Sequence, residues 1–232
     1  MAEQTSWVYI DLFAGAGGAS LGFRQAGAKP ILVVDSDHVA LQHWTANVKN
    51  IAPNTVKCQK IGTDDLDLPT PHNKMHLHAS SPCQSFSSAK TTTTTEEAAE
   101  GIRLLRLSLD AALSNGYASW TIENVATNAV LQIVNAYTHA FQNRVAYAVL
   151  DASDYGSPSS RKRMYVGPPK LISELKSMPT QPRKSARAAF AEHGLTLPDG
   201  AVALTVSRAL PRRKTRLELS TMWHSQSPVA TH

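Results

Sequence analysis

The N-terminal segment is the part of the sequence that most constrains the fold. Residues 7–13 (WVYIDLF) form a short apolar run, and Gly15, Gly17 and Gly18 interrupt it. A segment with helical spacing follows and stops at Gly27. An apolar strand, a glycine turn and a helix in this order predict the first half of a parallel strand–helix–strand unit.

The same alternation continues as far as residue 167. Further strands are predicted over 31–35, 75–79, 120–125 and 162–167, and the segment 144–156 alternates as a strand does and then turns. Further helices are predicted over 38–49, 96–113 and 128–141. The threonine run 91–95 is β-branched and polar, so it predicts a loop. Strands that alternate with helices predict an α/β fold with a doubly wound, mainly parallel sheet.

The composition excludes several classes of protein. The chain has 232 residues, of which 42% are hydrophobic, so a wholly disordered chain is not expected. The apolar runs are too short to span a membrane, and the N-terminus lacks the pattern of a signal peptide. Two cysteines cannot build a disulfide framework. We therefore expect a cytoplasmic protein with no membrane partner and no metal site.

Charge divides the chain into two unequal parts. Residues 161–232 contain 13 Lys and Arg against 4 Asp and Glu, whereas residues 1–160 contain 10 against 14. A basic last third suits a polyanionic partner such as a nucleic acid, although a solvated basic surface gives the same pattern. From Pro168 onward prolines recur and periodicity is weak, so 168–232 is predicted to be less regular, with one short helix at 185–193.

The glycine turn and the acid that ends the next strand indicate a cofactor. Gly15 and Gly17 allow close approach of the backbone to a ligand, and the following helix offers free N–H groups. Asp35 is placed to accept hydrogen bonds from ribose hydroxyls. Because Ser20 replaces the last glycine of the dinucleotide pattern, a nucleoside cofactor other than NAD is favoured. A tight turn without a ligand is the alternative.

Three further clusters carry candidate chemistry. Cys83 follows Pro82 in a loop rich in hydroxyls, which suits a nucleophile, although an inert buried cysteine is the commoner case. Glu123 ends a predicted strand and would face a ligand crevice. Arg161 and Arg163 share one side of an extended segment and can hold a phosphate or a carboxylate, or can be plain solvated charges.

Four segments in this order, DLFAGAGGASLGF, SPCQSFS, ENV and YGSPSSRKRMYVG, resemble the successive signature blocks of the cytosine-5 DNA methyltransferases. The resemblance covers residues 7–167. It implies a Rossmann-like sheet of the S-adenosylmethionine-dependent methyltransferase type, with S-adenosylmethionine as the cofactor and DNA as the partner. DNA methylation of the restriction–modification kind is the implied setting.

The resemblance also implies which residues contact the cofactor. They line the glycine turn, the end of the next strand, an acidic loop and the nucleophile loop: Phe13, Ala14, Gly15, Gly17, Asp35, Ser36, Asp64 and Pro82. Ser36 or Asp37 would lie near the adenine. Asp64 or Asp65 would supply the acid near the adenine amino group.

The implied catalytic residues are Cys83, Glu123, Arg163 and Arg161. Cys83 would attack carbon 6 of a cytosine flipped out of the duplex, which makes carbon 5 nucleophilic enough to accept a methyl group. Glu123 would stabilise the ring through nitrogen 3, for which a raised pKa helps. Arg163, with Arg161, would position the base and Glu123.

Two departures from the family pattern shape the expected domains. Ser159 stands where the family usually has Gln, and 168–232 shows no match to the last blocks. We therefore predict a catalytic domain over 1–167 and a partial target-recognition region over 168–232. The chain would be a fragment, a minimal variant, a remnant or one half of a split enzyme whose other blocks a second polypeptide supplies. A tRNA cytosine-5 methyltransferase and a non-catalytic subunit that binds nucleic acid are the alternative functions.

Overall fold

The structure is a computed structural model that describes residues 6–48, 51–62, 66–83, 94–192 and 194. Clustering of contacts divides the chain into a compact unit, Met1–Lys184, and a second unit, Ser185–His232. In the second unit the described helix is α6 (Ala186–Glu192), none of whose residues is buried. The predicted division at residue 167 into a catalytic and a recognition region stays a prediction.

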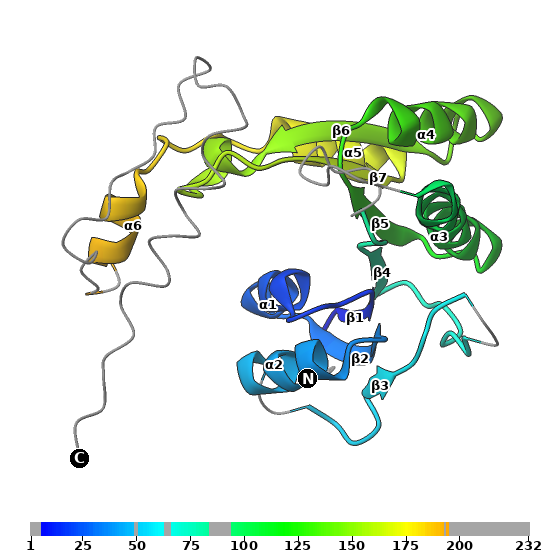
Figure 1. Ribbon diagram of the computed structural model, residues 1–232, viewed down its shortest axis with the longest axis horizontal. Helices are drawn as coiled ribbons and strands as arrows, with labels where there is room; N and C mark the ends of the chain where they lie inside the picture. Colours follow the sequence, from blue (N-terminus) through cyan, green and yellow to red (C-terminus); the bar gives the residue numbers. More distant parts are fainter. Residues whose placement is uncertain (1–5, 49–50, 63–65, 84–93, 193, 195–232) are drawn as a thin grey trace, which may run out of the picture. The chain divides into compact units, whose positions relative to one another are not determined.

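The first unit is built on one sheet of seven strands, and its order is β3-β2-β1-β4-β5-β7-β6 (Figure 1). The strands are β1 (Val8–Leu12), β2 (Lys29–Asp35), β3 (Val56–Cys58), β4 (Met75–Ala79), β5 (Ser119–Asn124), β6 (Ala146–Asp151) and β7 (Lys162–Gly167). The first five pair in parallel, and β7 pairs antiparallel with both β5 and β6. The predicted doubly wound, mainly parallel α/β fold is confirmed.

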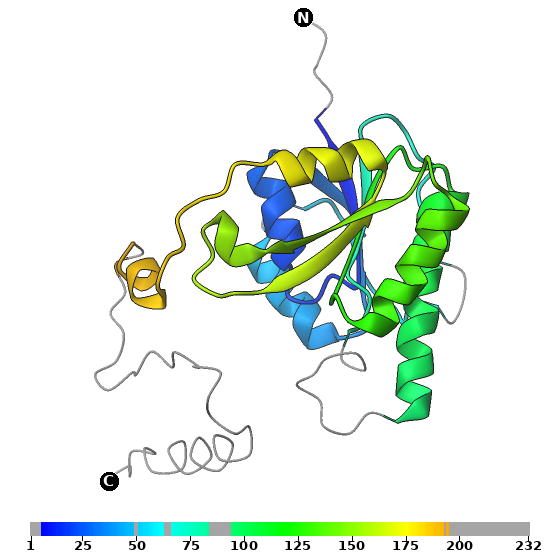
Figure 2. The same ribbon diagram turned by 90° about the horizontal axis from the view of Figure 1, so that it is seen from above.

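Helices cover both faces of this sheet. Helices α1 (Gly18–Gln25) and α2 (His38–Asn47) lie on one face, and α3 (Thr95–Ser114) and α4 (Asn128–Ala140) lie on the other (Figure 2). Helix α5 (Pro169–Ser177) packs on β6 and β7, on the same face as α1. Parallel strands that are covered on both faces bury continuous apolar runs, which is why the strand segments of this sequence are so apolar.

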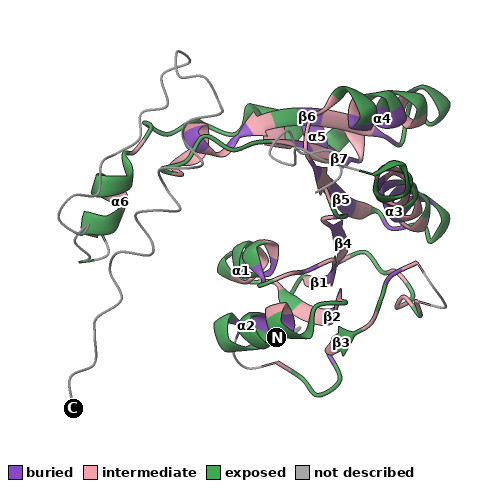
Figure 3. Cartoon of the chain, viewed as in Figure 1, coloured by how far each residue is buried: buried purple, intermediate pink, exposed green. Residues whose placement is uncertain are grey.

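The core follows from this layering, with the central strands β4 and β5 mostly buried and the outer faces of the helices exposed (Figure 3). Leu77 on β4 and Ile122 on β5 are fully buried and pack in the larger cluster with Leu105 of α3. A smaller cluster on the opposite face joins Val33 of β2 to Trp44 of α2. No helix among the described residues has both the length and the apolar character needed to cross a membrane.

Two elements were not predicted, and each has a local reason. Strand β3 is only three residues long and mostly exposed, so it has no apolar pattern of its own. Helix α5 follows Pro168 and begins with Pro169, and this pair of prolines indicated irregular chain. Proline is nevertheless favoured at the first position of a helix, where a backbone N–H would have no partner within the helix. Helix α3 begins one residue before the predicted start because Thr94 and Glu97 form a reciprocal capping box.

Candidate active site

The candidate residues gather at one edge of the sheet, where the parallel strands end. The glycine turn follows β1, Asp35 ends β2, the Cys83 loop follows β4, and Glu123 lies near the end of β5. Because β7 runs antiparallel, its first residues start at the same edge, and they include Arg163. Ligands of open α/β sheets bind outside the carboxyl ends of the strands, so this edge is the candidate active site.

The turn after β1 has a backbone that only glycine adopts easily at two of its positions. Gly15 and Gly17 have φ of 52° and 93°, and Phe13 has a φ of 58° although it carries a side chain. A Cβ on Gly17 would lie 2.7 Å from Cδ1 of the buried Trp44, whereas a Cβ on Gly15 would meet nothing within 4 Å. The turn is therefore packed tightly at Gly17 and has open space at Gly15.

Asp35 ties the turn after β1 to the end of β2. Its carboxylate accepts hydrogen bonds from the Gly15 amide (2.8 Å) and from the Asp37 amide (2.8 Å), one on each oxygen. Each carboxylate oxygen has a further lone pair, so both can still accept a hydroxyl. Asp35 thus positions the glycine turn and keeps the capacity for the ribose contact that the sequence predicts.

The other predicted cofactor residues have different fates. Ser36 is exposed beside Asp35, and Asp37 caps helix α2 by accepting from the Val39 and Ala40 amides. Asp64 lies outside the described residues. Ala14 is buried and its amide donates to the carbonyl of Val34, which holds the turn against β2.

The loop after β4 carries Pro82 and Cys83. Its start is fixed to the sheet, because the Ser80 amide donates to the carbonyl of Leu12 on β1 (3.1 Å). The side-chain amide of Asn124 on β5 donates from Nδ2 to the backbone carbonyl (3.2 Å) and the hydroxyl (3.1 Å) of the buried Ser81. Cys83 itself is partly exposed and free of any disulfide. A partly exposed thiol on an anchored loop is compatible with a nucleophile.

The Glu123 carboxylate lies close to both Arg161 and Arg163, the two arginines singled out in the sequence. Its Oε1 lies 2.9 Å from Arg163 Nε and 3.9 Å from Arg161 Nη2. The Glu123 and Arg163 side chains are 17% and 18% exposed, whereas Arg161 is 59% exposed. The Arg163 Nε–H is not aligned for a hydrogen bond, so the close contact is an ion pair. Burial raises the pKa of Glu123, and the cations of Arg163 and Arg161 partly oppose that rise.

Comparison with known proteins connects this arrangement to one family. Residues 8–185 match the family model of the C-5 cytosine-specific DNA methylases. The chain belongs to this family. It is 31% identical over 167 residues to the Type II methyltransferase M.HgiDI of Herpetosiphon aurantiacus, a match that covers 68% of this chain and 50% of that protein. It is 30% identical over 178 residues to the Type II methyltransferase M.XorII of Xanthomonas oryzae pv. oryzae, covering 67% and 38%.

A solved structure has a similar fold. A crystal structure of a protein encoded in an E. coli prophage, provisionally assigned as a DNA modification methyltransferase, superposes with a TM-score of 0.59 at 21% identity. It covers 84% of this chain and 56% of that one. The chain thus spans half or less of the length of the two methyltransferases above, and about half of this structural neighbour.

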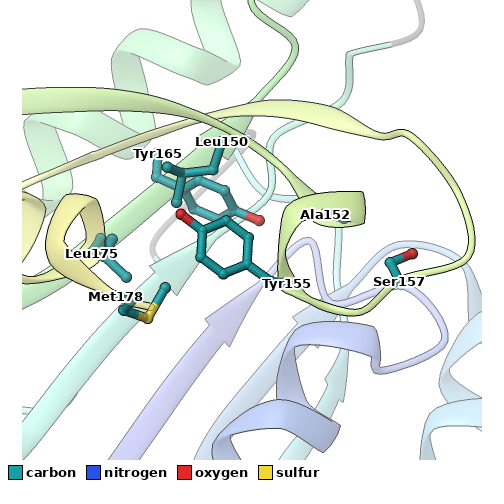
Figure 4. A pocket seen from close by; sticks show the side chains of 7 residues that line it. All are labelled: Leu150, Ala152, Tyr155, Ser157, Tyr165, Leu175 and Met178. Atoms are coloured by element: carbon teal, nitrogen blue, oxygen red, sulfur yellow. The ribbon is translucent and has the colours of Figure 1, made fainter. Parts of the chain in front are cut away.

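In this member of the C-5 cytosine-specific DNA methylase family, a cavity of about 370 Å³ lies beside β7 (Figure 4). It is on the same face of the sheet as the Glu123 side chain. Tyr165, which is opposite Glu123 in the strand register, lines it together with Tyr155 of the 3₁₀ turn η1 (Ala152–Tyr155). The remaining lining residues are Leu150, Ala152, Ser157, Leu175 and Met178. The pKa of Tyr165 is raised by burial and by the charge of Glu123.

Three residues at or beside this edge were missed in the sequence. Asn124 links β5, which carries Glu123, to the loop that carries Cys83. Asp151 holds the arginine segment, which contains Arg161 and Arg163. Asp11 is fully buried beneath the glycine turn and accepts a hydrogen bond from the Ser20 hydroxyl. The signal for Asp11 was present, because an acid within the apolar run VYIDL requires a buried partner.

Proposed function

We propose that this chain carries the catalytic machinery of a DNA (cytosine-5)-methyltransferase that uses S-adenosylmethionine. The observation that carries the proposal is the partly buried Glu123 carboxylate, held 2.9 Å from Arg163 at the sheet edge that also bears Cys83. The family membership and the Type II methyltransferase relatives support DNA as the substrate, rather than tRNA or a role without catalysis.

Cys83 is the proposed nucleophile. Its thiolate attacks carbon 6 of a flipped-out cytosine and forms a carbon–sulfur bond, which turns carbon 5 into an enamine-like nucleophile. After carbon 5 has been methylated, loss of its proton and elimination of the Cys83 sulfur restore the aromatic ring. Pro82, which precedes Cys83, restricts the backbone φ at its own position, and Asn124 anchors the start of the loop through Ser81.

Glu123 is the proposed partner of ring nitrogen 3. A carboxyl group that keeps its proton can donate a hydrogen bond to this nitrogen and so stabilise the charge that develops on the ring. Burial raises the pKa of Glu123 and favours the protonated form, while Arg163 and Arg161 limit the rise. The arginines thereby keep the carboxyl oriented and able to exchange its proton.

The turn after β1 fits a nucleoside cofactor with a charged tail. Space is open at Gly15, no side chain caps the N-terminus of α1, and Asp35 faces the turn. Phe13, Ala14, Gly15 and Gly17 would hold S-adenosylmethionine together with Asp35, Ser36, Asp64 and Pro82. When bound, S-adenosylmethionine supplies the electrophilic methyl group.

The basic part of the chain is the proposed DNA contact, and residues 168–232 would form part of the target-recognition region. A second polypeptide that supplies further family blocks is part of this proposal, as is action in the cytoplasm where bacterial DNA lies. Lysines and arginines there would bind backbone phosphates, so DNA affinity should fall as salt rises.

Covalent trapping tests the function. Duplex DNA that contains 5-fluorocytosine should form a stable adduct with the wild-type chain when S-adenosylmethionine is present, because fluorine cannot leave as a proton does. Cys83→Ser should form no adduct. Cys58→Ser is the matched control, because Cys58 is an exposed free cysteine on β3, and it should trap like the wild type.

Three other outcomes of this experiment would change the proposal. No adduct in the wild type, with cofactor binding intact, excludes catalysis by this chain alone. An adduct that appears only with an added polypeptide supports the split-enzyme form. An adduct with 5-fluorocytosine RNA and none with DNA would replace the DNA substrate by RNA.

A further inference from the structure

Asp151, the last residue of β6, closes the loop that leads to the arginine segment. Its Oδ1 accepts hydrogen bonds from the Ser153 amide (3.1 Å), the Ser153 hydroxyl (2.9 Å) and the Arg161 amide (3.0 Å). Its Oδ2 accepts from the Ser160 hydroxyl (2.6 Å). One buried carboxylate therefore joins the start and the end of the loop between β6 and β7.

These contacts determine where Arg161 and Arg163 lie. The Arg161 amide is held by the Asp151 carboxylate, and the Arg161 carbonyl accepts from the Ala152 amide (3.1 Å). With Arg161 held on both sides of its backbone, β7 pairs with β6 so that Leu150 is opposite Arg163. Alternation along a strand then places Arg161 and Arg163 on one face, where both approach the same Glu123 oxygen.

The four donors to Asp151 are neutral amides and hydroxyls. They stabilise the charged form of the carboxylate, the Ser160 hydroxyl most strongly, and they hold the pKa of Asp151 well below its usual range. An acceptor of this kind works through the position of its oxygen atoms, and an amide oxygen in the same place accepts the same backbone N–H groups.

We propose that Asp151 is a positioning residue that holds the Arg161–Arg163 pair against Glu123. The inference rests on the proposed cytosine methyl transfer, and it adds a residue that touches neither the substrate nor the cofactor. The charged and titratable groups that act on Glu123 are Arg163, Arg161 and Tyr165. Displacement of the two cations should therefore raise the pKa of Glu123.

Three variants separate the position of the acceptor from its charge. Asp151→Asn keeps an acceptor oxygen in place and loses the charge, whereas Asp151→Glu keeps the charge and moves the acceptor by one methylene. Asp151→Ala loses both. Asp154→Asn is the matched control, because Asp154 belongs to the same turn but pairs with Arg183 on the surface (2.7 Å).

Two measurements on the full chain are needed. The pKa of Glu123 is followed by the carboxyl carbon signal of ¹³C-glutamate, which is assigned by its loss in Glu123→Gln. Methyl transfer to DNA is measured across pH. We expect Asp151→Ala and Asp151→Glu to raise the pKa of Glu123 and to lower kcat by about tenfold to a hundredfold at unchanged cofactor affinity. Asp151→Asn and Asp154→Asn should stay within about threefold of the wild type.

The inference is overturned if folded Asp151→Ala or Asp151→Glu keeps the wild-type pKa of Glu123. It is also overturned if Asp151→Asn is as impaired as Asp151→Ala, because charge rather than position would then matter. If Asp151→Ala does not fold, Asp151→Asn and Asp151→Glu decide alone. If the wild type transfers no methyl group, the proposed function fails for this chain, and the Glu123 titration still decides the role of Asp151.

Discussion

Two carboxyl groups, the buried Asp11 on β1 and the partly buried Glu123 on β5, have different partners in the two halves of the sheet. Burial raises the pKa of both. Asp11 has the Ser20 hydroxyl as its hydrogen-bond partner, and its pKa rises to about 7. Glu123 has two guanidinium groups within 4 Å, which oppose the rise.

The partners explain what each acid can do. The Ser20 hydroxyl also accepts from the Trp44 indole (2.8 Å), so Trp44, Ser20 and Asp11 form a chain of hydrogen bonds beneath the glycine turn. Glu123 lies at the open edge with one oxygen held by cations. Asp11 therefore supports the shape of the turn, whereas Glu123 lies where the proposed function places the cytosine ring.

The largest loss of activity is expected when Glu123 loses its nearest guanidinium group. Arg163→Ala should lower methyl transfer by about a hundredfold or more, because the nearest cation to the carboxylate is lost. The pKa of Glu123 should rise, so activity that needs its protonated form should persist to higher pH. Rates measured with a radiolabelled methyl donor across pH check both effects.

Arg161→Ala is the control for that change, because Arg161 lies 3.9 Å from the same oxygen and is largely exposed. Exposed ion pairs contribute little, so its effect should be about tenfold smaller. Equal losses in the two variants would contradict the assignment of Arg163 as the main partner.

The next effect concerns the glycine turn above Asp11. Gly17→Ala should lower the free energy of unfolding by about 3 kcal/mol, because its φ is positive and the new Cβ would meet the buried Trp44. Cofactor affinity should fall with it. Gly18, the next residue and the first of α1, is the control: a Cβ added there would meet nothing within 4 Å, so Gly18→Ala should be neutral in chemical denaturation. A stable Gly17→Ala would show that the turn can rearrange.

Strand β4, between the two halves, carries the partly buried His76 and the buried His78, and their pKa values are lowered rather than raised. His76 bonds to the hydroxyls of Ser119 and Thr121, and burial lowers its pKa to about 4. A lowered histidine pKa means that stability is lost as pH falls below about 6.5. Between pH 7 and 4.5, His76→Gln should remove about 2 to 3 kcal/mol of the acid-induced loss of unfolding free energy. An unchanged pH dependence in the variant would show that His76 does not titrate there.

The last prediction concerns how Asp11 makes the stability of the fold depend on pH. Because its pKa is raised, the folded state binds a proton more tightly than the unfolded state, and stability falls as pH rises from about 4 to about 7. Relative to the wild type, Asp11→Asn should gain about 2 kcal/mol between pH 5 and pH 8. Glu123→Gln, compared in the same thermal unfolding series, should gain less, because the arginines favour the charged form of Glu123. A larger gain in Glu123→Gln would show that the pKa of Glu123 is raised further than that of Asp11.

Much of the fold could be predicted because each strand–turn–helix segment carries its own pattern. The apolar runs, the glycines after β1 and the acids at strand ends are local features, and they located most elements and the Cys83, Glu123 and arginine segments. Strand β3 could not be predicted, because it is short and exposed and exists through its pairing with β2. Helix α5 could not be predicted either, because Pro168 and Pro169 suggested irregular chain. The helix is stabilised by burial of Ile172, which depends on tertiary packing.

By itself the sequence determined the class of fold, the family and the chemical types at the site, since these follow from local pattern and motif order. Only the tertiary structure decided that β7 inserts antiparallel between β5 and β6, and that Arg163 rather than Arg161 is the close partner of Glu123. It also decided that Asp35 bonds to the Gly15 amide and that Asp151 anchors Arg161. The physical reason is that strand order and register arise from hydrogen bonds between distant residues, which no local spacing encodes.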